Sequence, residues 1–450
     1  MRKIIWIIVR KNIYLICMTV FLTSFVHAMD EDTVYYKGNY SVIVDSIVIK
    51  GNDITEDFVI LRELTFNVGD TLNPFLADYN RERIYSLNIF NEVRLQPFKF
   101  ENKNYLLIII EESWYIYPIP FIALKDRDWN KLSYGVRVRV KNFRGRNETL
   151  SGIMELGYDP SFNFYYTNPN LSYKLDLFAS LQLGYSEINN ESKIAESLAG
   201  TDFNHKLFFG KIILGKRFGL YHRLSTTLGL DYIETPFYIN RISASDQRID
   251  RTVILGFTYT YDTRDLAQFA TNGIFAALDY EIKGMGINNI NYRVSYLDFR
   301  EYRKLFGDLS GKWRFAARHT SGKVPYYDDS FIGLRERIRG HWNDLREGND
   351  YYIGSVEFNY YILKDYRLNM YFIPLLPKSL LSYRVGLVGG LFVDTGTTRF
   401  NGEPLTLNKF NTGYGAGLSL LFLPYLIMRF DYAFNEIGSS EFIFDLSSSF

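Results

Sequence analysis

Apolar and polar side chains alternate from about Ile116 to the end of the chain, and this pattern limits the available folds more than any other feature. A period of two places successive side chains on opposite faces of a β-strand. Residues 251–262 put apolar and aromatic side chains on one face and glycine, threonine and aspartate on the other, and residues 273–283 repeat the pattern. Many such strands favour a barrel with lipid outside and water inside. A soluble β-sandwich is the alternative.

Turn-forming pairs such as Asn272-Gly273 divide this region into about sixteen strand-like segments, and each spanning strand needs about 9–11 residues. Every backbone polar group inside a bilayer must be paired, so such a sheet has to close on itself. The sequence therefore predicts a mostly β protein. A transmembrane antiparallel β-barrel of about 16 strands is expected over residues 115–450.

Residues 1–28 are predicted to be a secretory signal peptide. Four basic residues accompany an almost wholly apolar run at residues 15–26, and Val26-His27-Ala28 fits a cleavage site. An uncleaved membrane anchor is the alternative. Cys17, the single cysteine of the chain, lies in this run, so cleavage would leave no disulfide or thiol chemistry. An exported chain without a later apolar run of helix-spanning length is either periplasmic or an outer-membrane barrel.

Composition and motifs argue against several classes of function. Aromatic residues make up 17% of the chain, which is heavy for a soluble protein. Without residues 1–28, 47 basic and 50 acidic side chains remain, so no basic excess points to nucleic acid. The remaining histidines lie far apart, and no nucleophile elbow, phosphate loop or dinucleotide motif occurs. We therefore predict no enzymatic activity, no cofactor and no metal site.

Residues 41–112 follow a different pattern and are predicted to form a small α+β domain with its own core. A strand over residues 42–50 precedes a helix that opens at an Asp53–Glu56 capping box. A second helix begins near Pro74. The order is β-α-α-β-β, with the last two strands at residues 92–97 and 105–111.

Two segments of this domain, Val68-Gly-Asp-Thr-Leu72 and Ile84-Tyr-Ser-Leu-Asn-Ile-Phe-Asn-Glu-Val93, resemble a POTRA domain. Such domains precede the barrels of the BamA/TamA outer-membrane assembly superfamily. The resemblance continues through the barrel as motifs in the family's order, although Arg146 replaces a glycine and Ala270 replaces a proline. These motifs are Asn142-Phe-Arg-Gly-Arg146, Tyr166-Thr-Asn-Pro-Asn-Leu171, Tyr261-Asp-Thr-Arg-Asp265 with Thr271-Asn-Gly273, Ile338-Arg-Gly-His341, Phe392-Val-Asp-Thr-Gly396, Gly413-Tyr-Gly-Ala-Gly417 and Arg429-Phe-Asp-Tyr-Ala433.

The resemblance gives a role to the charged, turn-rich segment at about residues 321–350, which would otherwise be a solvated loop. In the superfamily this loop folds back into the barrel, and its arginine meets the aspartate of the F-x-D-x-G strand. The matching residues here are Arg339 and Asp394, while His341 stands where an aromatic residue is usual. An arginine withdrawn from water needs an anionic partner, and bidentate pairing is the strongest. We predict a loop–barrel lock made of Arg339, Gly340 and Asp394.

By resemblance, the protein is an outer-membrane assembly factor that inserts or translocates β-barrel client polypeptides. Residues 29–112 would lie in the periplasm and the barrel in the bacterial outer membrane. The implied partners are unfolded outer-membrane or secreted polypeptides, outer-membrane lipid, and periplasmic proteins that pair with the POTRA sheet edge. Two alternatives stay open: a polypeptide-secretion pore of the two-partner type, and a surface-antigen barrel without translocation activity.

The final segment supports a first prediction. Phe442, Phe444, Leu446 and Phe450 share one face, and a terminal phenylalanine resembles the signal by which bacterial barrels are recognised for insertion. We expect Phe450→Ala to slow insertion and lower the amount of protein in the outer membrane, because an aromatic ring adds apolar area near the interface. Membrane fractionation and heat-modifiable migration measure the effect. Unchanged values would count against a signal role for Phe450.

Overall fold

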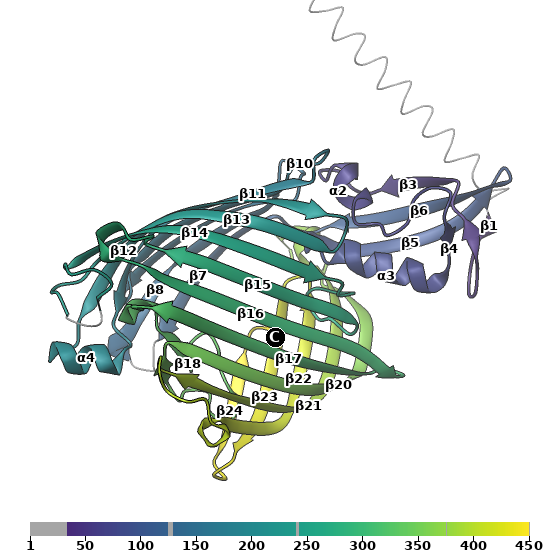
Figure 1. Ribbon diagram of the computed structural model, residues 1–450. Helices are drawn as coiled ribbons and strands as arrows, with labels where there is room; N and C mark the ends of the chain where they lie inside the picture. The colour runs from purple at the N-terminus through teal and green to yellow at the C-terminus, as the bar shows by residue number, and fades with distance from the viewer. Residues whose placement is uncertain (1–33, 125–128, 240–242, 375, 450) are drawn as a thin grey trace, which may run out of the picture.

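The computed structural model describes residues 34–124, 129–239, 243–374 and 376–449. Figure 1 shows a small N-terminal domain at one end of a large curved sheet. The mostly β fold predicted from the sequence is confirmed, since an α+β domain precedes a sheet of 16 strands. The predicted signal peptide and Phe450 lie outside the described residues.

The N-terminal domain contains a four-stranded sheet in the order β1-β5-β6-β3, in which β3 is parallel and β5 antiparallel to β6. Two helices and a second, two-stranded ladder between β2 and β4 complete it. Its elements are β1 (Val34–Tyr35), β2 (Val42–Ile43), β3 (Ser46–Lys50), α2 (Asp57–Leu61), β4 (Thr71–Leu72), α3 (Pro74–Tyr85), β5 (Phe90–Phe100) and β6 (Lys103–Glu112).

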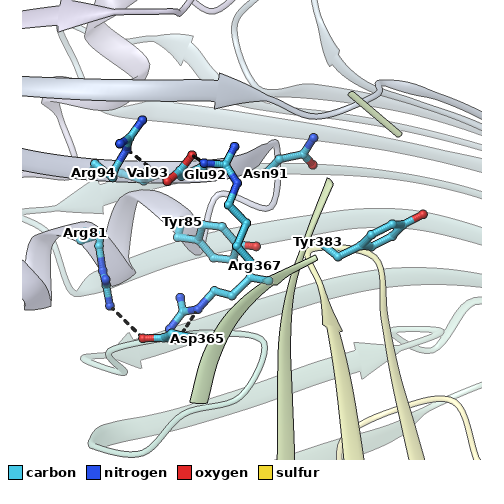
Figure 2. A pocket seen from close by; sticks show the side chains of 10 residues that line it. Arg81, Tyr85, Asn91, Glu92, Val93, Arg94, Asp365, Arg367 and Tyr383 are labelled. Carbon is cyan, nitrogen blue, oxygen red and sulfur yellow. Dashed lines mark hydrogen bonds and ion pairs between the residues drawn. The ribbon is translucent and has the colours of Figure 1, made fainter. Parts of the chain in front are cut away.

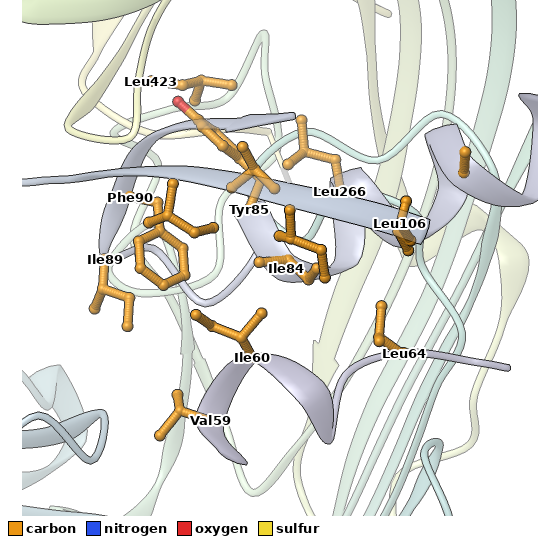
Figure 3. Packing of buried hydrophobic residues seen from close by; sticks show 14 of the residues in the cluster. Val59, Ile60, Leu64, Ile84, Tyr85, Ile89, Phe90, Leu106, Leu266 and Leu423 are labelled. Carbon is orange, nitrogen blue, oxygen red and sulfur yellow. The ribbon is translucent and has the colours of Figure 1, made fainter. Parts of the chain in front are cut away.

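The start of α3 follows from local sequence. The Asn73 side chain accepts the N–H of Leu76 at 2.8 Å, and Pro74 occupies the first helical position, where its missing N–H costs nothing. The helix then buries Ile84 completely in the domain core together with Ile60 and Leu106 (Figure 3).

Two local predictions for this domain were wrong. The first helix begins at Asp57, not at an Asp53–Glu56 capping box, because the Glu112 carboxylate accepts the N–H groups of Ile54 and Thr55 and holds them in a turn. The expected single strand over residues 42–50 is split into β2 and β3, because the Val44 backbone between them bonds to residues 69 and 70.

The barrel strands form one antiparallel sheet, and neighbours in sequence are neighbours in space. They are β7 (Ile116–Leu124), β8 (Leu132–Phe143), β9 (Glu148–Gly157), β10 (Ser161–Ser172), β11 (Leu177–Asn189), β12 (Asn204–Phe218), β13 (His222–Glu234), β14 (Ile249–Asp262), β15 (Gly273–Lys283), β16 (Tyr292–Phe306), β17 (Leu309–Gly322), β20 (Asp350–Asn369), β21 (Ser382–Arg399), β22 (Asn411–Leu423), β23 (Leu426–Asn435) and β24 (Ser440–Asp445).

The alternation seen in the sequence separates the two faces of the barrel wall. On β15, Leu278 is 51% exposed on the outer face, whereas the neighbouring Asp279 accepts a hydrogen bond from Thr258 of β14 at 2.6 Å. The turns beside the N-terminal domain are mostly short, and longer connections lie at the opposite end (Figure 1).

One of these longer connections contains α4 (Lys193–Ala199), a helix in a region where only strands were expected. Ser192 caps its first turn and Gly200 ends it in a left-handed conformation, so local capping creates a helix too short to show as a sequence period. Within the described ranges, no helix is long and apolar enough to cross a membrane.

The two ends of the large sheet are β7 and β24, and no ladder joins them among the residues that the structure describes. We call the boundary between these two strands the seam. The last strand is only six residues long. After Asp445 the chain leaves the wall, and the Ser449 hydroxyl accepts a hydrogen bond from Lys312. Phe442 and Phe444 remain highly exposed on the outer face.

The outer edge of β5 in the N-terminal domain is partly occupied by the chain itself. Val34 and Tyr35 of β1 pair with Lys99 and Phe98, and the Tyr36 N–H donates to the Pro97 carbonyl at 3.1 Å. The edge expected to receive a partner strand is therefore covered over its last residues.

Candidate functional site

The candidate site is the long loop between β17 and β20, residues 323–349, together with the barrel wall that it contacts. The loop contains a short hairpin of β18 (Ser330–Ile332) and β19 (Arg346–Gly348). Its side chains contact the wall strands β17, β20, β21 and β23.

Arg339 is the most tightly held residue of the loop. Its Nε and Nη2 atoms donate to the two oxygens of Asp394 at 2.6 and 2.8 Å, which is the predicted bidentate contact. Its Nη1 atom donates to Glu357 at 2.9 Å. Arg339 and Asp394 are 3% and 4% exposed, so the pair is withdrawn from water.

The surrounding wall compensates this buried charge in several directions. Glu357 on β20 also pairs with Lys312 on β17 at 3.0 Å. On β23, Asp431 lies 3.7 Å from Arg339 and 2.8 Å from Arg429. Arg429 reaches Asp445, the last residue of β24, at 3.1 Å. A chain of alternating charges thus runs from the loop to the terminal strand.

The aromatic residue of the F-x-D-x-G motif packs against the same guanidinium. The Phe392 ring centroid lies 3.5 Å from the centre of the Arg339 guanidinium, and Phe392 itself is buried. A cation stacked on an aromatic face in a desolvated site gains about 2 kcal/mol or more. Phe392 and Asp394 therefore hold the arginine together, one through its ring and one through its carboxylate.

Glycine is required on both sides of the loop–wall contact. Gly340 has a positive φ of 95°, and a side chain there would meet the Phe434 carbonyl at 2.7 Å. On β22, a side chain at Gly413 would lie only 1.6 Å from the Arg339 carbonyl oxygen. The loop backbone lies directly on the wall backbone, which explains the glycine of the Gly413-Tyr-Gly-Ala-Gly417 motif.

A second anchor ties the loop to β17, the strand next to β20 in the sheet. Glu336 accepts two hydrogen bonds at 2.8 Å from Arg314 on β17, and Arg314 also pairs with Asp298 on β16 at 3.0 Å. The two other arginines of the sequence differ from Arg339. Arg335 is exposed, and the Arg337 side chain donates to the Leu334 carbonyl and stacks on Trp342.

The loop also forms hydrogen bonds with the terminal hairpin of β23 and β24. Glu441 on β24 accepts the main-chain N–H groups of Gly340 and Trp342 at 2.7 and 3.0 Å. Asn435 on β23 donates to the Gly340 carbonyl at 3.2 Å. Sequence reasoning missed Glu441 and Glu357, because no motif singles out either residue and only the fold brings them to the loop.

His341, which replaces an aromatic residue of the family motif, makes polar contacts instead. Its two ring nitrogens lie 2.6 Å from Asp344 and 2.7 Å from Glu436. Burial by itself lowers the pKa of His341, but hydrogen bonds to these two carboxylates outweigh it and raise the pKa above its ordinary value. When it is protonated, His341 therefore ties the loop to the β23–β24 turn through an ion pair with Glu436.

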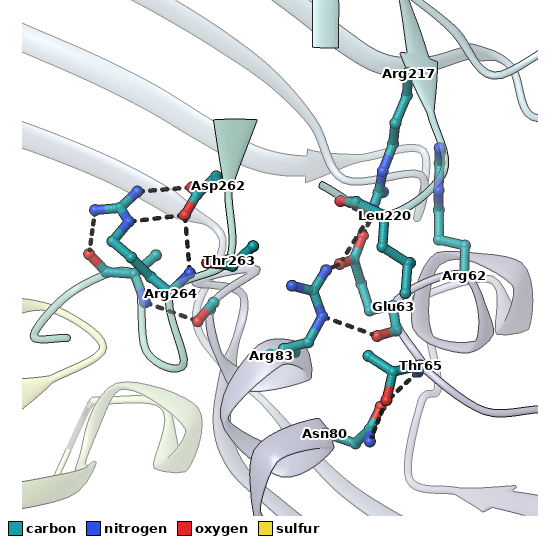
Figure 4. Close-up of polar contacts among 12 residues, drawn as sticks. Arg62, Glu63, Thr65, Asn80, Arg83, Arg217, Leu220, Asp262, Thr263 and Arg264 are labelled. Carbon is teal, nitrogen blue, oxygen red and sulfur yellow. Dashed lines mark hydrogen bonds and ion pairs between the residues drawn. The ribbon is translucent and has the colours of Figure 1, made fainter. Parts of the chain in front are cut away.

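The N-terminal domain is docked on the end of the barrel through buried ion pairs. Figure 4 shows Glu63 between Arg83 of α3 and Arg217 of β12, with oxygen–nitrogen distances of 2.8 and 2.6 Å. Burial alone would raise the pKa of Glu63, but the charges of Arg217 and Arg83 outweigh it and lower the pKa. One carboxylate thus links the two parts of the molecule.

A second set of pairs joins α3 and β5 to the β20–β21 hairpin and lines a cavity of about 220 Å³ (Figure 2). Arg384 binds Glu82 at 2.6 Å and Asp365 at 2.5 Å. Arg367 pairs with Glu92 and with Glu111 of the domain sheet. The domain core is also shared, since Leu266 and Leu423 of the barrel turns pack with it (Figure 3).

The structure gives a role to the early turn motif Asn142-Phe-Arg-Gly-Arg146. Gly145 has a positive φ of 71°, and a side chain there would lie 2.1 Å from the Ile54 carbonyl. The Gly145 carbonyl accepts the Glu56 N–H at 2.9 Å, and the Asn142 amide donates to Thr55 at 2.8 Å. The motif is a docking surface for the N-terminal domain, a role that its sequence alone did not indicate.

These contacts bind and position segments of the chain. In the part of the chain that the structure describes, no three His, Cys, Asp or Glu side chains gather to hold a metal ion. The fold and the site define a two-module β-barrel protein, with a loop tethered inside the barrel and an α+β domain docked at one end.

Comparison with known proteins assigns this architecture to a family. The model of the Omp85 superfamily domain matches residues 142–450, and that of the surface antigen variable number repeat, a POTRA domain, matches residues 42–113. The chain belongs to the Omp85 superfamily, and the resemblance inferred from its motifs is confirmed.

Two solved structures share the fold at low sequence identity. The crystal structure of BamA from Haemophilus ducreyi lacking POTRA domains 1–3 is 16% identical, with a TM-score of 0.53 over 92% of this chain and 89% of that one. CdiB from Escherichia coli is 11% identical, with a TM-score of 0.53 over 89% of this chain and 75% of that one. At these identities the similarity concerns the fold.

The loop contact leads to a second prediction. Arg339→Ala and Asp394→Ala should each destabilise the protein by about 3–5 kcal/mol, because each leaves a buried charge without its partner. The double mutant should be little worse than either single mutant. Urea unfolding of the detergent-solubilised barrel measures the free energies for a double-mutant cycle.

Arg335→Ala is the matched control for this cycle. Arg335 is an exposed arginine of the same loop, so its removal should cost no more than about 1 kcal/mol. Additive effects of the Arg339 and Asp394 substitutions would contradict a direct lock between them.

A third prediction concerns pH. The pKa of His341 is raised in the folded protein, so its contribution to stability is fully present below the unfolded value of about 6.5 and is lost as pH rises through the folded pKa. The difference in apparent Tm between the unaltered protein and His341→Asn should therefore shrink as pH increases from about 5.5 to 8.5. The same difference measured in a Glu436→Gln background should depend less on pH. A difference that is constant with pH would rule out the charged form of His341.

Proposed function

We propose that this protein assembles β-barrel polypeptides into the bacterial outer membrane, with its N-terminal domain in the periplasm. Its clients would be unfolded outer-membrane polypeptides, and the surrounding partner would be outer-membrane lipid. Membership of the Omp85 superfamily supports a role in handling polypeptides at this membrane.

The observation that carries the proposal is the seam. Strands β7 and β24 end the 16-stranded sheet without a ladder between them in the described residues. Extended polypeptides add to open sheet edges through main-chain hydrogen bonds, and alternate side chains then provide specificity. An incoming strand can therefore pair with an open edge of the wall at the depth of the lipid bilayer.

The internal loop supports a route through the seam more than one along the barrel axis. The Arg339 cluster and the Glu336–Arg314 pair tie the loop to one continuous part of the interior wall, from β17 to β23. Passage along the axis would require both buried anchors to break. The contacts of Glu441 with Gly340 and Trp342 place the same loop against the strand that borders the seam.

A polypeptide-secretion pore of the two-partner type is the second candidate. The similarity in fold to CdiB supports it. Such a pore needs an axial path, so it requires the loop to leave the interior, whereas assembly at the seam lets the loop stay in place.

The fourth prediction separates the two candidates. Purified protein in proteoliposomes should accelerate the folding of an unfolded outer-membrane barrel added from outside, as measured by its heat-modifiable migration. Single-channel recordings of the same protein in planar bilayers should show little conductance, because the loop occupies the interior.

A control protein carries two introduced cysteines, one at position 335 in place of Arg335 and one at a residue of the interior wall that faces it. The disulfide between them prevents the loop from leaving the interior. Client folding should survive this cross-link, whereas a secretion pore should be blocked by it. Large conductance without any acceleration of client folding would overturn the proposal in favour of a pore.

A further inference from the structure

The connection between β20 and β21 is the longest at the end of the barrel that carries the N-terminal domain. It covers residues 370–381, whereas residues 307–308 suffice to join β16 to β17. Its sequence, Met-Tyr-Phe-Ile-Pro-Leu-Leu-Pro-Lys-Ser-Leu-Leu, contains one lysine and no acidic residue. We call this connection the tip. Barrel turns on this side are usually short, so a long and apolar one calls for a physical explanation.

The apolar side chains of the tip are exposed. Phe372 is 80% exposed, and Tyr371 and Leu376 are exposed as well. The other long connection at this end, residues 263–272, differs in this respect, because its Leu266 is 4% exposed and packs into the domain core. A group of apolar side chains that the protein itself does not bury marks an interaction surface.

Polar contacts hold the tip and the end of β20 against the N-terminal domain. Arg367 pairs with Glu92 and Glu111 of the domain sheet (Figure 2). The Asn91 side chain of β5 donates to the Ser379 carbonyl of the tip at 2.5 Å. These contacts fix the hairpin relative to the domain, and they leave the apolar side chains of the tip exposed.

The exposed apolar surface of the tip continues that of the barrel wall. Phe358, Tyr360 and Ile362 are alternate residues of β20 and are exposed on the outer face. The pairing of β20 with β21 shifts twice beyond them, and Leu363 and Tyr366 are exposed there as well. The outer face of a transmembrane barrel contacts lipid. The apolar strip therefore runs from the lipid-facing wall to the tip.

The residue types at the tip are those of a membrane–water boundary. The Lys378 ammonium lies 5.9 Å from the centre of the Tyr371 ring, and both residues line a groove of about 630 Å³ together with Trp114. Two carboxylates at this groove, Glu111 and Glu112, are already bound within the protein. Tyrosine, tryptophan and lysine are favoured at the level of lipid headgroups, whereas lysine is depleted at protein–protein interfaces. A lipid surface is therefore the occupant that this patch fits.

We propose that the tip binds the periplasmic leaflet of the bilayer around the barrel, with Tyr371, Phe372 and Leu376 inserted among the lipids. The contacts of Arg367 and Ser379 with the domain then connect the domain to the membrane. This inference rests on the proposed place of the barrel in the outer membrane, and it does not depend on the assembly of clients.

The consequence concerns the orientation of the N-terminal domain. The chain passes from the domain to β7 through residues 113–115, and a single covalent connection of this kind leaves the domain free to rotate. A second attachment that is itself seated in the bilayer fixes the angle between the domain and the membrane plane.

The first test measures the depth of the tip in the bilayer. Single cysteines replace Phe372, Leu391 or Glu101 in a Cys17→Ser background, which contains no other cysteine, and each carries a nitroxide spin label. The protein is placed in vesicles of phosphatidylethanolamine and phosphatidylglycerol. Leu391 is exposed on the outer face of β21 and serves as the lipid control. Glu101, in the turn at the far end of β5, serves as the water control.

Oxygen concentrates in hydrocarbon and a hydrophilic nickel chelate in water, so the ratio of their collision rates with the label reports its depth. The ratio at Phe372 should approach that at Leu391 and exceed that at Glu101. A ratio at Phe372 equal to that at Glu101, with Leu391 in lipid, would overturn the proposal and favour a protein partner for the tip. Water-like ratios at both Phe372 and Leu391 would overturn the proposed membrane location as well.

The second test measures the orientation of the domain. Spin labels at Glu101→Cys in the domain and Leu407→Cys at the opposite end of the barrel give a distance distribution in the same vesicles. The double variant Phe372→Ser/Leu376→Ser should broaden this distribution. Phe75→Ser is the matched control, since Phe75 is an equally exposed apolar residue of α3 outside the tip, and it should leave the distribution unchanged. An unchanged distribution in the tip variant would overturn the role of the tip in holding the domain.

Discussion

Backbone groups in a barrel wall have to be paired within the wall, because hydrocarbon offers them neither donors nor acceptors. In the residues that the structure describes, ladders join each internal strand of the sheet from β7 to β24 to both of its neighbours, whereas the two outer edges have no ladder between them. Two features of the structure lie beside this unpaired boundary. Strand β24 is short, and the chain turns inward after Asp445 toward Lys312. The seam is therefore the place in the described wall where no ladder joins neighbouring strands, and the remainder of the wall holds its two edges in position.

The interior loop is held by a different balance of forces. Moving Arg339 out of water is unfavourable unless carboxylates surround it, and strands β20, β21 and β23 each supply one. Ion pairs of this kind contribute little net stability, but they select one arrangement because any other leaves a charge unpaired. The same loop bonds to Glu441, and the charge network continues to Asp445, both on β24. A change in the loop is thus transmitted to the strand beside the seam through direct contacts.

The N-terminal domain is attached to the barrel by more than a linker. Glu63 and Glu82 carry ion pairs from the domain to β12 and β21, and apolar residues of the barrel turns complete the domain core. The Asn142-Phe-Arg-Gly-Arg146 turn allows two backbones to touch, which a residue larger than glycine at position 145 would prevent. Orientation of the domain at the mouth of the barrel follows from these contacts. The strand β1, which covers part of the β5 edge, leaves less of that edge open to a partner than the sequence led us to expect.

The sequence by itself determined the barrel and the α+β domain before it, and its motifs led us to expect the pairing of Arg339 with Asp394. The period of two is a local property of each strand, and the order of motifs identified the family. Tertiary structure alone decided which other groups meet. Glu357, Glu441 and Gly413 reach the loop only after strands distant in sequence are brought together. The capping box expected at Asp53 does not form, because Glu112, which is distant in sequence, accepts the main-chain N–H of Thr55. Register is set by pairing between strands, and no single segment contains that information.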